Sequence, residues 1–485
     1  MNEAGIELQE SAKLLNNDSI PELVSEADRK MIRRVKWKTD LIILPLLVSI
    51  HFLAQMGRSD LANAKVAGLD EDFNLDASKY SLVASILLVG YLLFQLPAML
   101  LMRKVGPPVE FACAMIVWGV VTVCTIKATN YVHLMIIRTL VGASEAFIQG
   151  AVLYLSFWYP YNELATRGAI LYSSVALAGT INGLLAYLIE MKLDGVNGWT
   201  AWQWIFFIEG IIPIAWAFVI LFLLPNTPET VKLFFTPQEK KVIIARSRAA
   251  HNTGESKIIP KLIVKVLTQP QFWFVVLMDA GVHFCTTSLS NFIPDIIKGL
   301  GYESIQAQLM TVIVYCSALV GILAAARVAD KLQKRGLIII ICTAVAAIGY
   351  VLLLTLTNDA ARLAATCVVA AGAYPISVLS LVWMATNNVG YTFRASAAGM
   401  VNIFSQLIAI SANFAFSDPP YYRMGLGISL VMISISGIMA GLQIGYLSLM
   451  NKVKRAEQHG ELAAWRRQLT IDEIGNAHPD FFFSF

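Results

Sequence analysis

Long apolar stretches alternate with short polar ones over most of the 485-residue chain. The apolar stretches run to about 20 residues, the length of α-helix that crosses the hydrocarbon core of a bilayer. We therefore predict an all-α integral membrane protein with twelve transmembrane helices in two six-helix halves. The predicted spans are 41–63, 78–101, 109–128, 132–156, 168–191, 202–224, 271–294, 306–326, 337–356, 362–386, 395–416 and 424–449.

The longest polar stretch lies between the sixth and seventh predicted spans. Each side of it holds six spans, and the two sides echo each other. WYPYNELATR follows the fourth span, and WMATNNVGYTFR follows the tenth. An internal duplication of this kind is how many secondary transporters build a binding site between two halves. The predicted parts are a cytoplasmic N-tail (1–39), a first half (40–224), a cytoplasmic linker (225–270), a second half (271–449) and a cytoplasmic C-tail (450–485).

Composition and charge agree with a chain that spans a bilayer. Hydrophobic residues make up 57% and charged residues only 14%, whereas soluble domains carry about 25% charged residues. The net charge of +4 is small and lies between the apolar runs, so no nucleic-acid partner is indicated. Lys and Arg concentrate in the N-tail, the linker and the C-tail, and the positive-inside rule then predicts that both termini are cytoplasmic. The polar N-terminus lacks the apolar core of a cleaved signal peptide.

Several chemistries lack their motifs. The six cysteines lie inside apolar segments, where Cys behaves as a small hydrophobe, so we expect neither a disulfide framework nor a metal site. No GxxxxGK[ST] motif is present to cradle ATP, and HExxH and GxSxG are also missing. The polar segments are too short for a separate catalytic domain. We therefore expect a secondary transporter without a cofactor rather than an enzyme.

Two charged residues lie in the middle of the fourth predicted span. Arg138 and Glu145 begin and nearly end the stretch RTLVGASEAF. Seven residues of helix are almost two turns, so both side chains leave nearly the same face, roughly 10 Å apart along the axis. A charged side chain at the bilayer centre costs about 2.5–3.5 kcal/mol. The two residues are therefore either a structural pair neutralised by other helices or functional residues that face a cavity.

Arg58, near the outer end of the first span, is a candidate for binding an acid. Its guanidinium fork matches a carboxylate with two hydrogen bonds. The alternative is that Arg58 reaches out to the lipid headgroups. Asp60, one turn further out, is interpreted as a loop residue.

The seventh predicted span offers a second polar face. Asp279 and His283 are four residues apart and therefore neighbours on a helix. His283 is either a packing residue or a substrate contact. Weaker candidates for hydrogen bonds to a substrate are Asn291, Asn387, Asn388 and Asn402.

These features together resemble a known family. The twelve spans, RVADKLQKRG between the eighth and ninth, and Arg138 in the fourth are similar to the major facilitator superfamily. LVGASEAFIQGAVLYLSFWYPYNELATRGAIL resembles the helix 4–5 signature of its anion:cation symporter branch. ANAKVAGLDEDFNL, GWTAWQWIFFIEGI, GYESIQAQLMTV and HPDFFF resemble the fungal allantoate permease group, especially its nicotinic acid permeases. The resemblance covers nearly all of 30–485, although MRKVGPP lacks the Asp of the usual first-half motif.

The resemblance implies proton-coupled uptake of a small organic anion, such as nicotinate or allantoate, across the plasma membrane. Members work by alternating access, and we expect a monomer. The branch residues that match Arg138 and Glu145 are tied to proton coupling, and the arginine that matches Arg58 meets the anionic substrate. Glu209, in IFFIEGI, matches a family signature near the cytoplasmic side, and we interpret it as structural.

Two alternatives stay open. Alternating access is reversible, so the protein could export an acidic metabolite by proton exchange, and a third class is a non-transporting nutrient sensor. The branch usually has Asp before the substrate arginine, but this chain has Gly57 there. A single carboxylate in the pathway predicts one proton per monovalent anion. A second proton would have to come from a group such as Asp60, Asp279 or His283.

Overall fold

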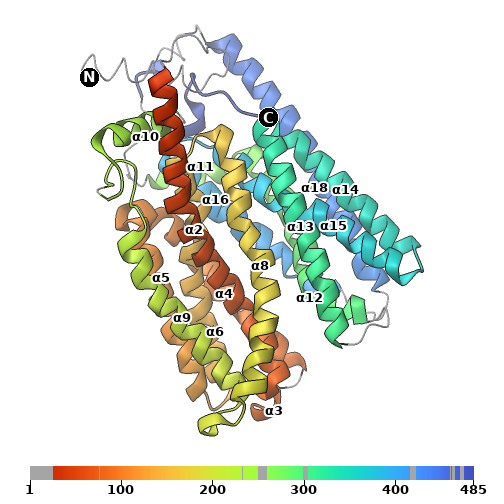
Figure 1. The fold of residues 1–485 in the computed structure, drawn as a ribbon. Helices are drawn as coiled ribbons and strands as arrows, with labels where there is room; N and C mark the ends of the chain where they lie inside the picture. The colour runs from red at the N-terminus through yellow and green to blue at the C-terminus, as the bar shows by residue number, and fades with distance from the viewer. Residues whose placement is uncertain are drawn as a thin grey trace. The chain divides into compact units, whose positions relative to one another are not determined.

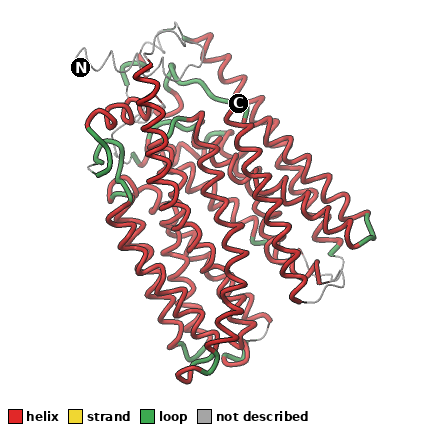
Figure 2. The backbone as a smooth tube through the Cα atoms, viewed as in Figure 1, coloured by secondary structure: helices red, strands yellow, loops and turns green. Residues whose placement is uncertain are grey.

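The computed structural model is helical throughout its regular elements (Figures 1 and 2). Helices occupy all twelve predicted positions, and in the described residues ten of them are long and apolar enough to cross a membrane. The helices at the fifth and eleventh positions are not among those ten. The structure describes residues 26–75, 77–231, 233–249, 259–298, 304–415, 422–458, 460, 465–469 and 474–485.

The chain divides into two compact units, Met1–Pro160 with Leu177–Ser256, and Tyr161–Ala176 with Lys257–Phe485. Helix α8 (Tyr161–Leu193) contributes to both. The other elements of the first unit are α2 (Glu26–Ala64), η1 (Lys65–Leu69), α3 (Asp70–Asp72), α4 (Ala77–Val105), α5 (Pro107–Cys124), η2 (Thr125–Lys127), α6 (Tyr131–Glu145), η3 (Ala146–Gly150), α7 (Ala151–Trp158), η4 (Val196–Gly198), α9 (Ala201–Leu223) and α10 (Pro237–Ala249). Those of the second are α11 (Pro260–Leu267), α12 (Pro270–Lys298), α13 (Ser304–Leu332), α14 (Arg335–Thr355), α15 (Asp359–Thr386), α16 (Tyr391–Ala409), α17 (Ala412–Ala415), α18 (Arg423–Glu457) and η5 (Gly475–Ala477).

The linker holds two short helices, α10 and α11, that the apolar pattern does not predict. Glu239 and Thr236 cap the start of α10 reciprocally, because each side chain accepts a hydrogen bond from the backbone N–H of the other residue. Lys38 of α2 also contacts Glu239, with 2.8 Å between Nζ and Oε2. Ser247 Oγ donates to the carbonyl of Phe157 at 2.7 Å. These contacts fasten α10 to the first unit.

The two units repeat the same helix pairings. In the first unit α4 packs on α6, α5 on α9 and α2 on α9. In the second unit α13 packs on α15, α14 on α18 and α12 on α18. These are in each case the second helix with the fourth, the third with the sixth and the first with the sixth. The repeated pairing is the pattern that a duplicated six-helix half produces.

Two glycines bring the backbones of α4 and α6 into direct contact. A Cβ on Gly142 of α6 would overlap the carbonyl oxygen of Leu87, and a Cβ on Gly90 of α4 would overlap that of Thr139. Small residues allow this closeness between helices in a membrane. Because Gly142 lies between Arg138 and Glu145, the crossing fixes the position of both charged residues.

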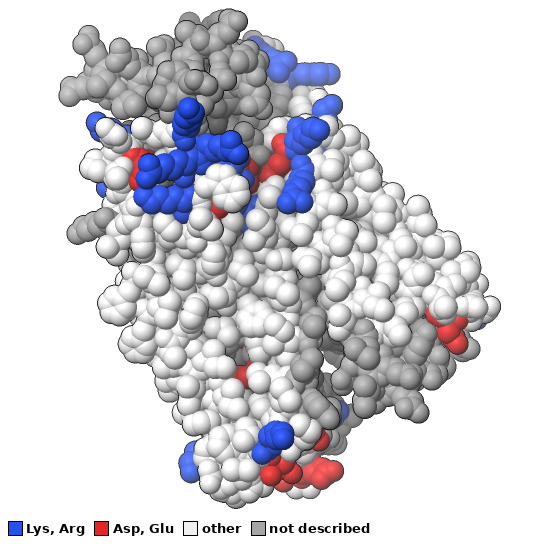
Figure 3. Space-filling model, viewed as in Figure 1, with Lys and Arg blue, Asp and Glu red and all other residues white. Residues whose placement is uncertain are grey.

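The surface of the first unit carries its charges at the helix ends. On the face shown in Figure 3, Lys and Arg gather at the end where α2 begins and α10 lies, and a smaller mixed group lies near α3. Most of the length between is uncharged. Large apolar side chains are exposed along the helices, including Leu93 (67%) and Phe222 (68%). This surface suits contact with lipid tails.

Candidate functional site

The first unit buries a group of five ionisable residues, which we call the charged cluster. It consists of Arg58 and Asp60 on α2, Arg138 and Glu145 on α6, and Glu209 on α9. Asp60, Arg138, Glu145 and Glu209 are each 5% exposed or less. Buried charges are costly unless they are paired, so their pairing indicates what the cluster can do.

Arg58 and Glu145 form an ion pair between α2 and α6. Arg58 Nε donates to Glu145 Oε2 at 2.9 Å, and the guanidinium carbon lies 5.0 Å from the centre of the Tyr91 ring. Arg58 Nη2 and Glu145 Oε1 have no hydrogen-bond partner among the described residues. Arg58 therefore turns toward Glu145 rather than outward to the headgroups. Nε is occupied by Glu145, whereas Nη2, which lies beside Nε on the same edge of the guanidinium, is still able to donate to an anion.

Glu145 lies where the fourth transmembrane helix changes its winding. Helix α6 ends at Glu145, and the tighter 3₁₀ segment η3 follows before α7 continues the span. A short 3₁₀ stretch inside a helix often marks a functional hinge. A carboxylate at this point is well placed for its ionisation to affect the geometry of the helix.

Arg138 lies beside groups on α2 and α9. Its guanidinium carbon lies 5.5 Å from the centre of the Phe206 ring. Asp60 contributes more than Glu145 to its electrostatic environment, and Glu209 also acts on it. Glu145 is thus paired with an arginine from another helix rather than with the arginine on its own helix face.

The structure corrects the interpretation of Asp60 and Glu209 that we made from the sequence. Asp60 is not a loop residue, because α2 continues to Ala64 and the Asp60 side chain is only 2% exposed. Glu209 lies in the half of α9 that starts at Ala201, away from the linker, so it is not near the cytoplasmic side that we predict. The two carboxyl groups lie close enough to act on each other, but both oxygens of Glu209 and Oδ1 of Asp60 have no hydrogen-bond partner among the described residues. The sequence did give a signal for both residues, because each is a charged residue inside a predicted apolar span.

The second unit buries a carboxylate that is well supplied with donors. Asp279 is fully buried and accepts hydrogen bonds from Ser380 Oγ at 2.8 Å and Ser405 Oγ at 3.1 Å. His283 Nε2 lies 3.3 Å from Asp279 Oδ2, as the i, i+4 spacing predicts. Asn402 is 5% exposed, and its Oδ1 has no partner among the described residues. Asn402 and His283 therefore remain candidates for polar contacts with a substrate.

Asn387 and Asn388 hold the C-terminal segment instead of facing a ligand. Asn387 Nδ2 donates to the carbonyl of Ser484 at 3.0 Å, and Asn387 Oδ1 accepts from the Ser484 backbone N–H at 2.8 Å. Asn388 Oδ1 accepts from Asn476 Nδ2 at 3.0 Å. Because the tail occupies these amides, Asn387 is not part of the proposed substrate site. The side chain of Asn291 lies outside the described residues.

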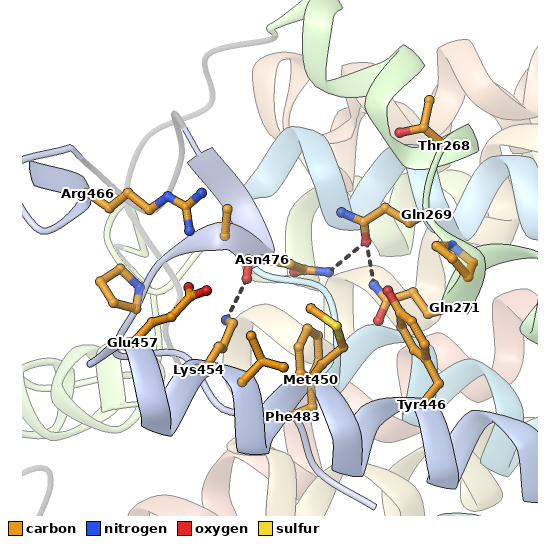
Figure 4. Close-up of a pocket in the computed structure, with 14 residues that line it drawn as sticks. Thr268, Gln269, Gln271, Tyr446, Met450, Lys454, Glu457, Arg466, Asn476 and Phe483 are labelled. Atoms are coloured by element: carbon orange, nitrogen blue, oxygen red, sulfur yellow. Dashed lines mark hydrogen bonds between the residues drawn. The ribbon is translucent and has the colours of Figure 1, made fainter. Parts of the chain in front are cut away.

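Further contacts anchor the same tail. Asn451 of α18 binds Phe483 with both amide atoms, at 2.9 Å and 2.8 Å. Lys454 Nζ donates to the carbonyls of Asn476 and Phe481, each at 2.7 Å. A cavity of about 340 Å³ lies between the tail, α18 and the start of α12, with Tyr446 on its wall (Figure 4). The sequence pattern gave no periodic signal for this docking, although the aromatic run at the end of the chain was visible.

The cysteines of the described chain are all unpaired. Among the described residues, no group of three or more His, Cys, Asp or Glu side chains is arranged to hold a metal ion. The carboxyl and guanidinium groups of the charged cluster can bind protons and pair an anion with an arginine.

Comparison with known proteins identifies the family of this chain. The Major Facilitator Superfamily model matches residues 47–413. An uncharacterized transporter of Schizosaccharomyces pombe is 31% identical over 424 residues, which cover 86% of this chain and 84% of that protein. The high-affinity nicotinic acid transporter of Saccharomyces cerevisiae is 28% identical over 488 residues, 99% of this chain and 89% of its own. The solved proton:xylose symporter XylE shares the fold, with a TM-score of 0.66 at 15% identity over 84% of this chain and 95% of that one. The chain belongs to the major facilitator superfamily and is a multi-pass membrane transporter of that family.

Proposed function

We propose that the protein imports a small organic anion, such as nicotinate, allantoate or a similar carboxylate, together with protons by alternating access. The observation that carries the proposal is the hydrogen bond between Arg58 and Glu145 inside the charged cluster. Similarity to a high-affinity nicotinic acid transporter supports the substrate class.

Arg58 is the proposed binding site for the substrate carboxylate. A guanidinium group binds a carboxylate best through two parallel hydrogen bonds. Nη2 of Arg58 is without a partner among the described residues, and Nε is held by Glu145. The Tyr91 ring beneath the guanidinium restricts its plane. A substrate carboxylate would therefore compete with Glu145 for the same edge of Arg58.

This competition couples the anion to a proton. While Glu145 is ionised, it neutralises Arg58 and opposes substrate binding. A proton on Glu145 removes that negative charge, and the substrate carboxylate takes its place beside Arg58. Loss of the proton to the other side restores the pair and displaces the substrate. Arg58 itself stays charged throughout, because a guanidinium does not lose its proton in the physiological range.

We place the protein in the plasma membrane as a monomer with both termini cytoplasmic. The concentration of Lys and Arg in the tails and linker supports this orientation. A single cysteine introduced at Gln238, in a background without the native cysteines, tests it. Residue 238 is exposed on the linker and should resist an impermeant thiol reagent in intact cells. Labelling from outside would reverse the orientation.

The function is tested by uptake in a host that lacks its own permeases. Labelled nicotinate, allantoate and pantothenate are supplied separately, at acidic and at neutral external pH. We expect saturable accumulation of one of them, stimulated by external acid and abolished by a protonophore. Saturable efflux without uptake would instead indicate an exporter. A lack of transport of any small carboxylate in either direction would contradict the proposal.

A further inference from the structure

The carboxyl groups of Asp60 and Glu209 face each other in the charged cluster. They come from α2 and α9, and each lies within hydrogen-bonding reach of the other. Both oxygens of Glu209 and Oδ1 of Asp60 lack a hydrogen-bond donor among the described residues when both groups are taken as ionised. An ionised carboxylate can only accept a hydrogen bond. The two groups can therefore bond to each other only if one of them carries a proton.

The charge balance of the cluster also indicates that one of the two carboxyl groups carries a proton. The cluster contains three carboxyl groups and two guanidinium groups; the side chain of Arg58 is 27% exposed, and the other four residues are 5% exposed or less. Arg58 is committed to Glu145, so Arg138 remains for both Asp60 and Glu209. If both were ionised, the cluster would hold an uncompensated negative charge, which is costly in a buried site. One proton shared by Asp60 and Glu209 makes the cluster neutral.

The other polar neighbours do not supply a further positive charge. Asn182 of α8 lies beside Asp60 and donates Nδ2 to the carbonyl of Met56 at 2.9 Å. Tyr80 of α4 lies within electrostatic range of Arg138, which Phe206 of α9 covers on one side. These neighbours are neutral in the physiological range. Among the described groups that act on the pair, Arg138 is the cation and Glu145 the remaining acid.

We propose that Asp60 and Glu209 form a second proton-binding site, which shares one proton in this conformation and releases it to the cytoplasm during transport. The inference rests on the proposed function, in which Glu145 carries the first proton. Two protons then accompany one monovalent anion, and one net positive charge moves inward in each cycle. This replaces the expectation, based on Gly57, that a single proton is carried.

Release of the proton has a local cause. Adjacent carboxyl groups share a proton because like charges at close range oppose double ionisation. When water enters the site or Arg138 moves closer, the doubly ionised pair is stabilised and the proton leaves. The bond that breaks is the O–H of one carboxyl group, and the proton passes to water on the inner side.

The first experiment reads the shared proton without any transport substrate. Infrared spectra of the purified protein in lipid at neutral pH should show the C=O stretch of a protonated carboxyl group. Both oxygens of buried Glu110 also lack a partner among the described residues, so the spectra are recorded in a Glu110→Gln background. There the band should disappear in Asp60→Asn and in Glu209→Gln, because the remaining carboxylate then pairs with Arg138. It should persist in Glu190→Gln, a control at an exposed carboxylate of α8, and in Glu145→Gln. A spectrum of the Glu110→Gln background without the band would overturn the proposal and leave the role of Arg58 and Glu145 untouched.

The second experiment asks whether the proton travels. Vesicles with a fixed pH gradient are clamped at different potentials with potassium and valinomycin, and nicotinate uptake is measured. For one net charge, 60 mV inside-negative should raise the limiting accumulation by about tenfold. Asp60→Asn and Glu209→Gln should still accumulate nicotinate but lose the response to potential. Wild-type accumulation that ignores the potential would show that the shared proton stays in place, and it would overturn the second site.

Discussion

Arg58 on α2 and Glu145 on α6 share a hydrogen bond of 2.9 Å, although 87 residues of chain separate them. The bond joins the residue that should hold the anion to the residue that should hold the proton. Ionised Glu145 and a bound carboxylate cannot both neutralise the one guanidinium group.

Substitution of Arg58 should weaken substrate binding strongly, while the protein still reaches the membrane. Hydrogen bonds to charged groups are worth about 1.5–3 kcal/mol, so Arg58→Ala should lower the apparent affinity for the substrate by more than about tenfold. Arg58→Lys should retain part of it, since it keeps the charge but loses the fork. Arg33→Ala, at an exposed arginine of the same helix, is the matched control. A loss below tenfold in Arg58→Ala, with normal delivery to the membrane, would favour a site elsewhere.

A single methyl group at the crossing of α4 and α6 should destabilise the first unit. In Gly142→Ala the new Cβ meets the carbonyl oxygen of Leu87, which cannot move without shifting α4. Overpacking of this kind costs about 1–3 kcal/mol. Thermal unfolding in detergent should therefore occur at a lower temperature. Gly445→Ala, where no heavy atom lies within 4 Å, should unfold as the wild type does. Equal midpoints for the two variants would show that the helices separate easily.

The docked tail should protect the end of the chain. Asn387→Ala removes two hydrogen bonds to Ser484, each worth about 1 kcal/mol net. We expect carboxypeptidase to remove the last residues faster in this variant than in the wild type. Gln468→Ala, an exposed residue outside these contacts, is the control. Unchanged digestion in Asn387→Ala would indicate that the tail does not depend on this amide.

The attachment of α10 should weaken in acid. The hydrogen bond from Lys38 holds the pKa of Glu239 below its usual value of 4.5. A lowered pKa in the folded state stabilises the protein above the unfolded value, and that contribution is lost as pH falls through the folded value. The protection of α10 amides from exchange, measured relative to an unfolded chain at the same pH, should therefore fall below about pH 4.5 in the wild type. In Glu239→Gln exchange should already be fast at neutral pH, and Glu190→Gln should behave as the wild type. Slow exchange in Glu239→Gln at neutral pH would refute the attachment.

Apolar runs predicted the helices well because a bilayer requires about 20 consecutive apolar residues for each span, which is a strong local signal. The linker helices α10 and α11 were missed, since short polar helices leave no such run and depend on contacts such as Lys38 with Glu239. Docking of the tail onto Asn387 was also missed, because it depends on hydrogen bonds between segments far apart in the sequence. These features are decided by tertiary contacts, which no local pattern encodes.

The candidate site was predicted in part. An ionisable residue in an apolar run is conspicuous, and this identified Arg138, Glu145 and Arg58. Which arginine pairs with Glu145 depends on how α2 and α6 pack, and no local pattern in the sequence identifies it. Asp60 was interpreted as a loop residue although the predicted span 41–63 contains it, because a carboxylate near the end of an apolar run resembles one that lies outside the bilayer.

Exchange and accumulation in Glu145→Gln test the central account most directly. A neutral glutamine cannot re-neutralise Arg58 after the substrate leaves, so the empty carrier should fail to return. Vesicles preloaded with unlabelled nicotinate should exchange it for labelled nicotinate, whereas net accumulation driven by a pH gradient should fall to background. Glu190→Gln should retain both activities. Accumulation by Glu145→Gln at the wild-type level would contradict the claim that Glu145 and the substrate compete for Arg58.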